Sequence, residues 1–258
     1  MTRLKKLFDA KSSKVLNVYC TAGYPTLGST LPIIAALENN GADLVEIGMP
    51  YSDPLADGPV IQESGAKAIE NGMSIEVLFD QLKSLRTTCN IPVVLMGYMN
   101  PVLQYGFEKF CAAAAAVGVD GLILPDMPAY EFESTYGAIV KKHGLDFIFL
   151  VTPETPTERI VYLDSLSSGF LYAVSASATT GSALNFDAVD TYLQKLKQMQ
   201  LINPILVGFG VKDAASFELA SRHTAGAIIG SAYIKALENS VDVTSTTAQF
   251  LSSVIGQK

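Results

Sequence analysis

The sequence is poor in the residues that build disulfide frameworks and metal sites. Its 258 residues include only three cysteines and two histidines. Cys20, Cys89 and Cys111 lie far apart and form no C-x-x-C pair, so a disulfide framework and a structural zinc site are both disfavoured. His143 and His223 each lie in a polar segment typical of a helix end, which excludes a histidine-rich metal site. We therefore expect reduced, mostly buried thiols and no metal centre.

Positive charge and long apolar runs are also scarce. The chain has 18 Lys and Arg against 25 Asp and Glu, a formal net charge of −7, which disfavours nucleic acid and anionic membranes as main partners. No apolar run approaches the length needed to span a bilayer. Residues 1–14 are basic but have no long apolar segment or small-residue cleavage site, so they predict a short amphipathic helix and not a signal peptide. The simplest location for the chain is the cytoplasm.

Short apolar runs, in contrast, recur along the whole chain, of which 49% is hydrophobic. Most are rich in Val, Ile, Leu or Phe and are bounded by Gly, Pro, Asp or Asn. This pattern is typical of strands that are buried on both faces of a parallel sheet. The eight runs lie at residues 15–21, 43–48, 92–98, 120–125, 146–151, 170–175, 204–210 and 225–230.

Segments with helical periodicity fill the gaps between these runs. Gly41 is a plausible C-cap of the first of them and Ser74 a good N-cap of the second. Eight strands alternating with eight helical segments predict an α/β protein, a (β/α)₈ TIM barrel that forms a single domain over residues 1–258. An open doubly wound sheet also alternates, but it usually has fewer strands. The helical segments lie at residues 30–41, 74–88, 106–118, 131–144, 156–169, 186–200, 212–223 and 248–256.

Glu46 is unusual because it lies inside an apolar strand, in the segment VEIGMPYSDPLADGPVIQ of residues 45–62. Barrel strands are covered on both sides, so we expect this carboxyl to be buried and its pKa to be raised. A carboxyl with a pKa nearer neutrality can both donate and accept a proton. The alternative is a structural glutamate that is satisfied by backbone groups or a basic partner.

Asp53 and Asp57 follow the same strand, in a loop with nearby prolines and glycines. Because barrel enzymes carry their chemistry at the carboxyl ends of the strands, these side chains are candidates for the site. Glu46 and Asp57 can divide the roles: one buried and exchanging protons, the other ionised and accepting from an N–H. The alternative is that both aspartates serve as turn or helix N-cap residues.

Small residues follow the last three predicted strands and are typical of a phosphate site. They let backbone N–H groups approach an anion near a helix N-terminus, an arrangement that recurs after strands seven and eight of barrels. The GFG at residues 208–210 does not complete G-x-G-x-x-G, because position 213 is aspartate. The alternative is that these glycines serve only tight turns. The candidates are Gly181, Gly208, Gly210, Gly230 and Ser231.

The residues that the strand ends lack disfavour several types of reaction. No lysine ends an interior strand, which disfavours a Schiff-base aldolase, and no Ser-His-Asp set or D-x-D carboxylate pair is available. Metal-free acid–base chemistry on a phosphorylated small molecule is left. Aromatic and apolar residues near the strand ends hint at a flat, apolar substrate portion. They are Tyr19, Met96, Tyr98, Phe149, Tyr172 and Phe209.

Taken together, these motifs resemble the α subunit of tryptophan synthase over essentially the whole chain. The most specific match is VEIGMPYSDPLADGPVIQ. Further matches follow in order along the chain, namely NVYCTAGYP, LMGYMNPVLQYG, DGLILPDMP, SASATTG, VGFGVKD and GAIIGSAYIK. The resemblance implies the same barrel and a retro-aldol cleavage of indole-3-glycerol phosphate to indole and glyceraldehyde 3-phosphate.

The resemblance also implies roles for individual residues. Glu46 corresponds to the glutamate that moves protons at indole C3 and at the glycerol hydroxyl. Asp57 corresponds to the aspartate that bonds indole N1–H, and Tyr172 to a tyrosine near the scissile bond. The implied indole pocket consists of Tyr19, Met96, Ile123, Leu150 and Phe209. The implied phosphate cradle consists of Gly181, Gly210, Gly230 and Ser231, and Thr180 lies in the implied mobile loop of residues 176–185, placed to contact Asp57.

Some positions depart from the family pattern. Tyr19 stands where phenylalanine is common, and Ala176 and Ala178 replace residues that are often Arg and Gly, which affects expectations for loop closure. The resemblance further implies a β-subunit partner that carries pyridoxal phosphate, in a complex of two α and two β chains, and no cofactor on this chain. The residues we expect at that interface are Pro50, Asp53, Pro54, Asn100 and Pro101.

Two other functions stay open from the sequence. The same barrel can host a phosphosugar epimerase or isomerase, which the choice of substrate would distinguish. A catalytically silent barrel that only activates its partner is the second alternative. The presence of Glu46, Asp57 and Tyr172 together argues against it.

Overall fold

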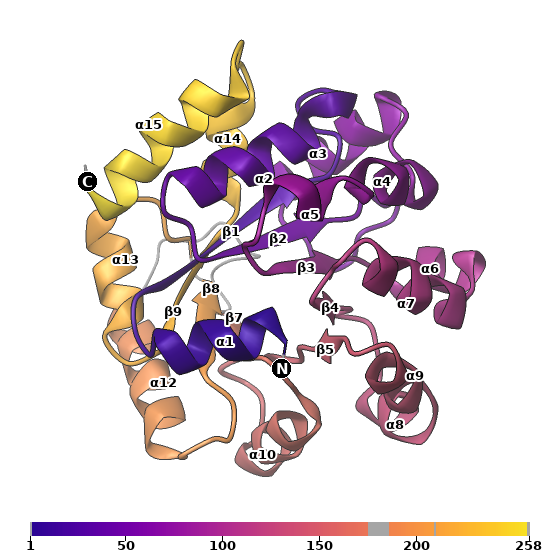
Figure 1. Cartoon of the computed structure of the whole chain (residues 1–258). Coiled ribbons are helices and arrows are strands. Elements are labelled where there is room, and N and C mark those ends of the chain that lie inside the picture. Colours follow the sequence, from indigo (N-terminus) through magenta and orange to yellow (C-terminus); the bar gives the residue numbers. More distant parts are fainter. Residues whose placement is uncertain (1, 175–185, 209, 257–258) are drawn as a thin grey trace.

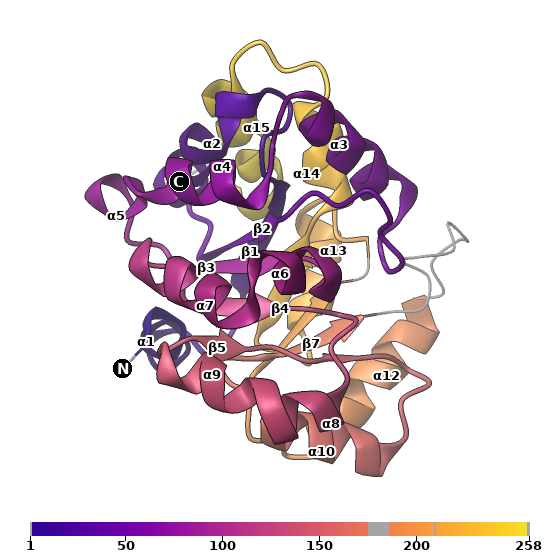
Figure 2. The ribbon, with the colours of Figure 1, turned by 90° about the vertical axis from the view of Figure 1, so that its right-hand side faces the viewer.

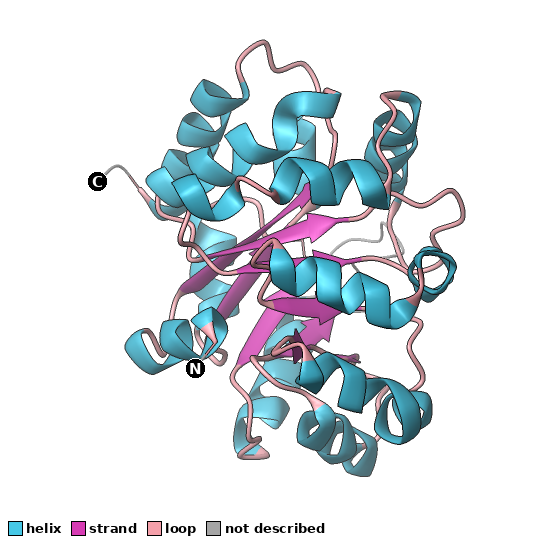
Figure 3. Ribbon diagram, turned by 45° about the vertical axis from the view of Figure 1, so that its right-hand side comes forward, coloured by secondary structure: helices cyan, strands magenta, loops and turns pink. Residues whose placement is uncertain are grey.

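Nine parallel strands form one sheet that curls into a barrel, with the helices arranged around its outer face (Figures 1 and 3). This computed structural model describes residues 2–174, 186–208 and 210–256. The strand order is β5-β4-β3-β2-β1-β9-β8-β7-β6. The strands are β1 (Val15–Thr21), β2 (Leu44–Gly48), β3 (Val93–Met96), β4 (Gly121–Ile123), β5 (Asp146–Phe147), β6 (Leu150–Val151), β7 (Leu171–Val174), β8 (Ile205–Gly208) and β9 (Gly226–Ile229).

The predicted (β/α)₈ barrel is confirmed, although the fifth apolar run gives two short strands and not one. β5 pairs with β4, and β6 pairs with β7. Between them, the Ile148 N–H donates to the Leu122 carbonyl at 3.0 Å, and the Phe149 carbonyl accepts from the Tyr172 N–H at 3.0 Å. The two ends of the strand order therefore meet in one continuous segment, which closes the ring of eight strand segments.

Each predicted helical segment contains a helix, and Pro59–Glu70, Met99–Tyr105 and Ser231–Leu237 form further helices outside the predicted segments. Gly41 lies just after the first predicted helix with φ +96°, and the Ser74 hydroxyl accepts the Val77 N–H at 3.3 Å as an N-cap. In the described part of the chain, none of the helices is long and apolar enough to cross a membrane. The α-helices are α1 (Arg3–Ala10), α2 (Thr30–Asn39), α3 (Pro59–Glu70), α4 (Ile75–Leu82), α5 (Leu85–Thr88), α6 (Met99–Tyr105), α7 (Phe107–Ala116), α8 (Ala129–Glu131), α9 (Gly137–Lys142), α10 (Thr157–Leu166), α12 (Phe186–Gln198), α13 (Ala214–Ser221), α14 (Ser231–Leu237) and α15 (Val243–Ile255).

Helix α1 closes the amino-terminal end of the barrel. Figure 2 shows it at the end opposite the loop that joins β2 to α3. Its Leu4 is fully buried, and Leu7 and Phe8 pack against the same cluster. Because this layer fills the barrel at one end, open space for chemistry is left at the other, where the strands end. The layer beneath α1 is formed by Val15, Leu44, Val94, Ile123, Ile148, Phe170, Leu206 and Ile228.

The three cysteines are buried and unpaired, as the sequence predicts. Cys20 is on β1 and Cys111 on α7, while Cys89 follows α5, so each belongs to a different part of the barrel wall. Burial raises the pKa of the Cys20 and Cys111 thiols to about 12. Such thiols stay protonated and unreactive, which fits a packing role.

Candidate active site

Glu46 lies inside the barrel, in the middle of a strand whose residues are all buried. Side chains alternate along a strand, so Glu46 faces the same way as Leu44, a member of the barrel-end layer. Its exposed fraction is 1%. The only hydrogen bond that the described residues give to its carboxyl is from Asn17 Nδ2 to Oε2, at 2.9 Å, and none of the described basic residues pairs with it. The alternative of a basic partner is therefore not met in the described chain.

Burial sets the acidity of Glu46. Desolvation raises its pKa to about 8, the Asn17 hydrogen bond lowers it, and the negative charge of Asp57 raises it further. A carboxyl of this kind is protonated in the free protein at neutral pH. It can therefore donate a proton first and accept one afterwards.

Asp57 belongs to the loop between β2 and α3, and its carboxyl does not cap the helix. The N-cap of α3 is Gly58, which has no side-chain cap bond, so the N-cap alternative for Asp57 is wrong. Its Oδ2 accepts instead from the Tyr98 hydroxyl at 2.9 Å, and that hydroxyl accepts the Ala56 N–H at 3.0 Å. Burial raises the pKa of Asp57, and the Tyr98 hydrogen bond partly offsets this rise. Asp53, in contrast, is exposed and contacts Ser52.

Glu46 and Asp57 both influence the same two tyrosines. The charges of Asp57 and Glu46 both raise the pKa of the Tyr172 hydroxyl, and both also raise that of Tyr19, after the dominant effect of burial. Tyr172 is in addition affected by Tyr19. Two acids from one strand–loop unit and two tyrosines from different strands of the ring therefore lie close enough to influence one another.

Two glycines make room for these tyrosine rings. A Cβ on Gly48 of β2 would lie 1.9 Å from the Tyr19 hydroxyl, and a Cβ on Gly208 of β8 would lie 2.8 Å from the Tyr172 hydroxyl. Distances this short exclude any larger side chain unless the ring moves. Gly208 is thus required by the packing of Tyr172, a role that neither the phosphate nor the turn interpretation of its motif anticipated.

The predicted apolar wall lies on the inward positions of the strands. Ile123 of β4 belongs to the barrel-end layer, and Met96 of β3, Leu150 of β6 and Tyr172 of β7 pack against that layer. These side chains come from strands in different parts of the ring. They form an apolar floor in the barrel interior, which suits a flat hydrophobic group.

The predicted phosphate residues are only partly within the described chain. Gly210 follows β8 with φ +70°, a left-handed conformation that favours glycine, and it is exposed. Gly230 is the N-cap of α14, and Ser231 is its exposed first residue. Phe209, Thr180 and Gly181 lie outside the described residues, as do Ala176 and Ala178.

Two polar residues of the site were not given these roles by the sequence. Asn17 contacts Glu46, and Tyr98 contacts Asp57. The available signal for Asn17 was a polar residue two positions before Tyr19 in an apolar run, hence on the same face of β1. For Tyr98 the signal was its place after β3, but its partner depends on the packing of two loops.

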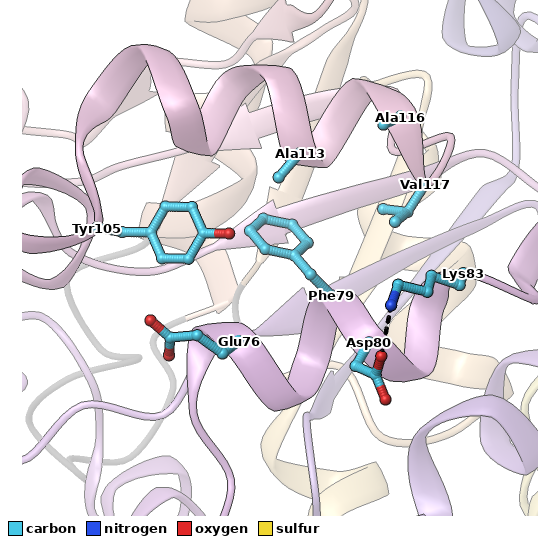
Figure 4. Close-up of a pocket in the computed structure, with 8 residues that line it drawn as sticks. All are labelled: Glu76, Phe79, Asp80, Lys83, Tyr105, Ala113, Ala116 and Val117. Carbon is cyan, nitrogen blue, oxygen red and sulfur yellow. Dashed lines mark hydrogen bonds and ion pairs between the residues drawn. The ribbon is translucent and has the colours of Figure 1, made fainter.

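A hollow on the outside of the barrel contains none of the predicted site residues. It lies between α4 and the α6–α7 pair, where Figure 4 shows Tyr105 beside Phe79, and Asp80 paired with Lys83. The described part of the chain also contains no group of three or more His, Cys, Asp or Glu arranged to hold a metal ion. The barrel interior is therefore the candidate active site.

Comparison with known proteins identifies the family of this chain. The sequence model of the family described as tryptophan synthase alpha chain matches residues 6–257. The chain belongs to this family. It is 48% identical to the tryptophan synthase alpha chain of Flavobacterium psychrophilum over 246 residues, which cover 95% of this chain and 96% of the relative. It is 49% identical to that of Flavobacterium johnsoniae, covering 89% and 91%.

Solved structures of the family share the fold of this chain. The tryptophan synthase subunit alpha of Legionella pneumophila str. Paris superposes with a TM-score of 0.89 at 33% identity, covering 98% of this chain and 97% of that one. The tryptophan synthase complex of Pyrococcus furiosus gives a TM-score of 0.87 at 32% identity, covering 96% and 100%. As a family member, the chain is a lyase of tryptophan biosynthesis, the indole-3-glycerol phosphate lyase half of tryptophan synthase.

Proposed function

We propose that this chain cleaves indole-3-glycerol phosphate by acid–base catalysis, with Glu46 and Asp57 as the acting pair. The observation that carries the proposal is the proximity of two carboxyls in the barrel, Glu46 buried and Asp57 half-buried, whose charges both act on Tyr172. One of them has a pKa of about 8, and no described basic residue pairs with either. Differences in environment of this kind let two carboxyls of one site take different roles.

The proposed reaction needs only the proton of Glu46. The protonated carboxyl donates to indole C3, and the ring becomes an electron sink with positive charge at its nitrogen. Asp57, ionised, accepts the N1–H and stabilises that charge. The Glu46 carboxylate then accepts the proton of the adjacent glycerol hydroxyl. A carbonyl forms, the carbon–carbon bond breaks, and its electron pair returns to the indole ring, so Glu46 ends protonated as it began.

The other predicted residues bind and orient the substrate in this scheme. Tyr172 lies next to the scissile bond, and the indole ring rests on the apolar floor together with Tyr19 and Phe209. Backbone N–H groups at the start of α14 and after β8 hold the phosphate. The residues of this cradle are Gly181, Gly210, Gly230 and Ser231, and Thr180 contacts Asp57 when substrate is bound.

The indole product is passed to a β subunit, which carries pyridoxal phosphate and joins indole to serine; this chain itself binds no cofactor. A complex of two α and two β chains is proposed. The Pyrococcus furiosus relative was solved as a tryptophan synthase complex, which supports association with a partner chain. The proposed contact residues surround the loops after β2 and β3, where Asp53 and Asn100 are exposed. They are completed by Pro50, Pro54 and Pro101.

Purified chain should release indole from indole-3-glycerol phosphate, and addition of a β subunit should increase the rate. Ribulose and mannosamine phosphates, offered under the same conditions, should remain unchanged. Turnover of either sugar phosphate in place of the indole compound would favour the epimerase or isomerase alternative. A chain that stimulates a β subunit but never releases indole would favour the silent activator.

The pH dependence of the cleavage should show two limbs. Glu46 must start protonated, so kcat/KM should fall as the pH rises through about 8, the pKa of this carboxyl. Asp57 must be ionised, so kcat/KM should also fall at acid pH, and this limb should lie above the ordinary range of an aspartate because burial raises the pKa of Asp57. Steady-state rates across the pH range measure both limbs. A rate that keeps rising above pH 9 would contradict the assignment of Glu46 as the initial acid.

Replacing Tyr98 should affect Asp57 selectively. The Tyr98 hydroxyl donates to Asp57 and lowers the pKa of that carboxyl. Tyr98→Phe removes this hydroxyl, so the pKa of Asp57 should rise and the acid limb should move to higher pH. We expect kcat/KM at neutral pH to fall about tenfold, the typical value of a hydrogen bond to a charged group. Tyr105→Phe, which alters the outer hollow, is the matched control and should behave as the unchanged chain. Equal pH profiles for both variants would exclude Tyr98 from the positioning of Asp57.

A further inference from the structure

Asn17 is a polar residue that packing alone does not explain. It lies on β1 inside the barrel, fully buried, between the inward-facing side chains of Val15 and Tyr19. Its Nδ2 donates to Glu46, but its buried Oδ1 has no hydrogen-bond partner among the described residues. A buried amide with one half unpaired costs stability compared with an apolar side chain of similar shape. Among the described residues, the only hydrogen bond of the Asn17 side chain joins it to Glu46, the carboxyl that we propose as the acid.

Asn17 donates a hydrogen bond to only one of the two carboxyl oxygens of Glu46. Oε2 faces an N–H donor at 2.9 Å, so in the protonated state the acidic hydrogen belongs on the other oxygen, Oε1. When Glu46 has given up its proton, the same N–H donates to a carboxylate, and the hydrogen bond becomes shorter and stronger. The same amide therefore serves both states of the proposed reaction.

We propose that Asn17 is a positioning residue for proton transfer: it fixes the Glu46 carboxyl inside the barrel, assigns the transferable proton to Oε1 and stabilises the carboxylate after transfer. This inference rests on the proposed function, in which Glu46 is the acid. It extends that function by giving the acid a dedicated partner on the neighbouring strand, placed by the pairing of β1 with β2.

The titratable groups that interact electrostatically with Glu46 allow its titration to be followed. Tyr19 and Cys20 lie on β1 and Tyr172 on β7; burial raises the pKa of both tyrosines well above the ordinary value and that of Cys20 to about 12. These three groups stay neutral where Glu46 titrates. Asp57, from the loop after β2, must be ionised in the proposed reaction and therefore governs the acid limb. The alkaline limb of the pH profile therefore reports Glu46.

The test uses two substitutions. Asn17→Leu preserves the approximate shape of the side chain, and Asn17→Ala introduces a smaller side chain that cannot clash with its neighbours. Both remove the N–H that lowers the pKa of Glu46, so the alkaline limb should move up by about one pH unit. A weaker acid protonates indole C3 more slowly, so kcat should fall about tenfold while KM changes less than about twofold. The pKa of Glu46, measured by NMR on protein labelled in its glutamate side chains, should move in the same direction without substrate.

Thr247→Val is the matched control. Thr247 is fully buried and bonds the Tyr233 hydroxyl at 2.6 Å, in the helices outside the barrel. It should lower the melting temperature but leave the pH profile of indole release unchanged. Unchanged kcat and alkaline limb in a folded Asn17→Leu or Asn17→Ala chain would overturn the inference. If the unaltered chain releases no indole, the proposed function fails instead, and an NMR shift of Glu46 in the variants would still establish the Asn17 contact.

Discussion

Glu46→Gln should reduce the release of indole from indole-3-glycerol phosphate by a factor of about 10² to 10⁴, the usual contribution of a positioned acid–base group. Glutamine preserves the shape of the side chain and can still contact Asn17, but it has no proton to give to C3. KM should change little, because the amide still fills the floor of the site. Steady-state kinetics of indole release give both parameters. Turnover within tenfold of the unaltered chain would remove Glu46 from its proposed role.

The stability of the Glu46→Gln variant provides an internal control, because we expect the substitution to stabilise the chain at alkaline pH while it reduces activity. The pKa of Glu46 is raised from 4.5 to about 8 on folding, so the folded chain binds more protons than the unfolded chain between these values. Stability from this group is therefore complete below about pH 4.5 and is lost as the pH rises toward 8. Glutamine never ionises, so Glu46→Gln should melt higher than the unaltered chain above pH 8. A variant that is less active and more stable cannot owe its loss of activity to unfolding.

Asp120→Ala should lower the free energy of unfolding by about 3–5 kcal/mol, the cost of removing one partner from a buried charge network. Asp120 is 5% exposed and accepts from Arg3 at 3.0 Å, from Arg86 at 2.8 Å and from the Val93 N–H at 2.8 Å. Without its carboxylate, Arg86 stays partly buried beside carbonyl groups only, and α1 loses its polar attachment to the barrel. Urea unfolding followed by circular dichroism measures the effect.

Asp9→Ala is the control for this experiment. Asp9 also pairs with a cation of α1, Lys5 at 3.0 Å, but both side chains are largely exposed. Exposed pairs of this type contribute little, so the unfolding curve should hardly move. An equal and small effect of both substitutions would show that α1 is held by its apolar face alone, through Leu4 and its neighbours.

The strands of the barrel wall could be predicted from short stretches of the sequence. Most apolar runs are bounded by turn residues and are largely buried on both faces, so their strands could be predicted without knowledge of their neighbours. The burial of Glu46 followed from the same local pattern, because a carboxyl inside such a run has no route to water. The raised pKa that we predicted from this burial is confirmed.

The partners of the buried and half-buried polar side chains depended on the tertiary structure. Glu46 meets Asn17 over 29 positions, Asp57 meets Tyr98 over 41, and Arg3 meets Asp120 over 117. Strand register and loop packing decide these contacts, and neither leaves a periodic signal in the sequence. The split of the fifth strand is of the same origin, since its two halves bond to different neighbours. Local composition thus determined which groups lose water, whereas closure of the ring decided which of them face each other.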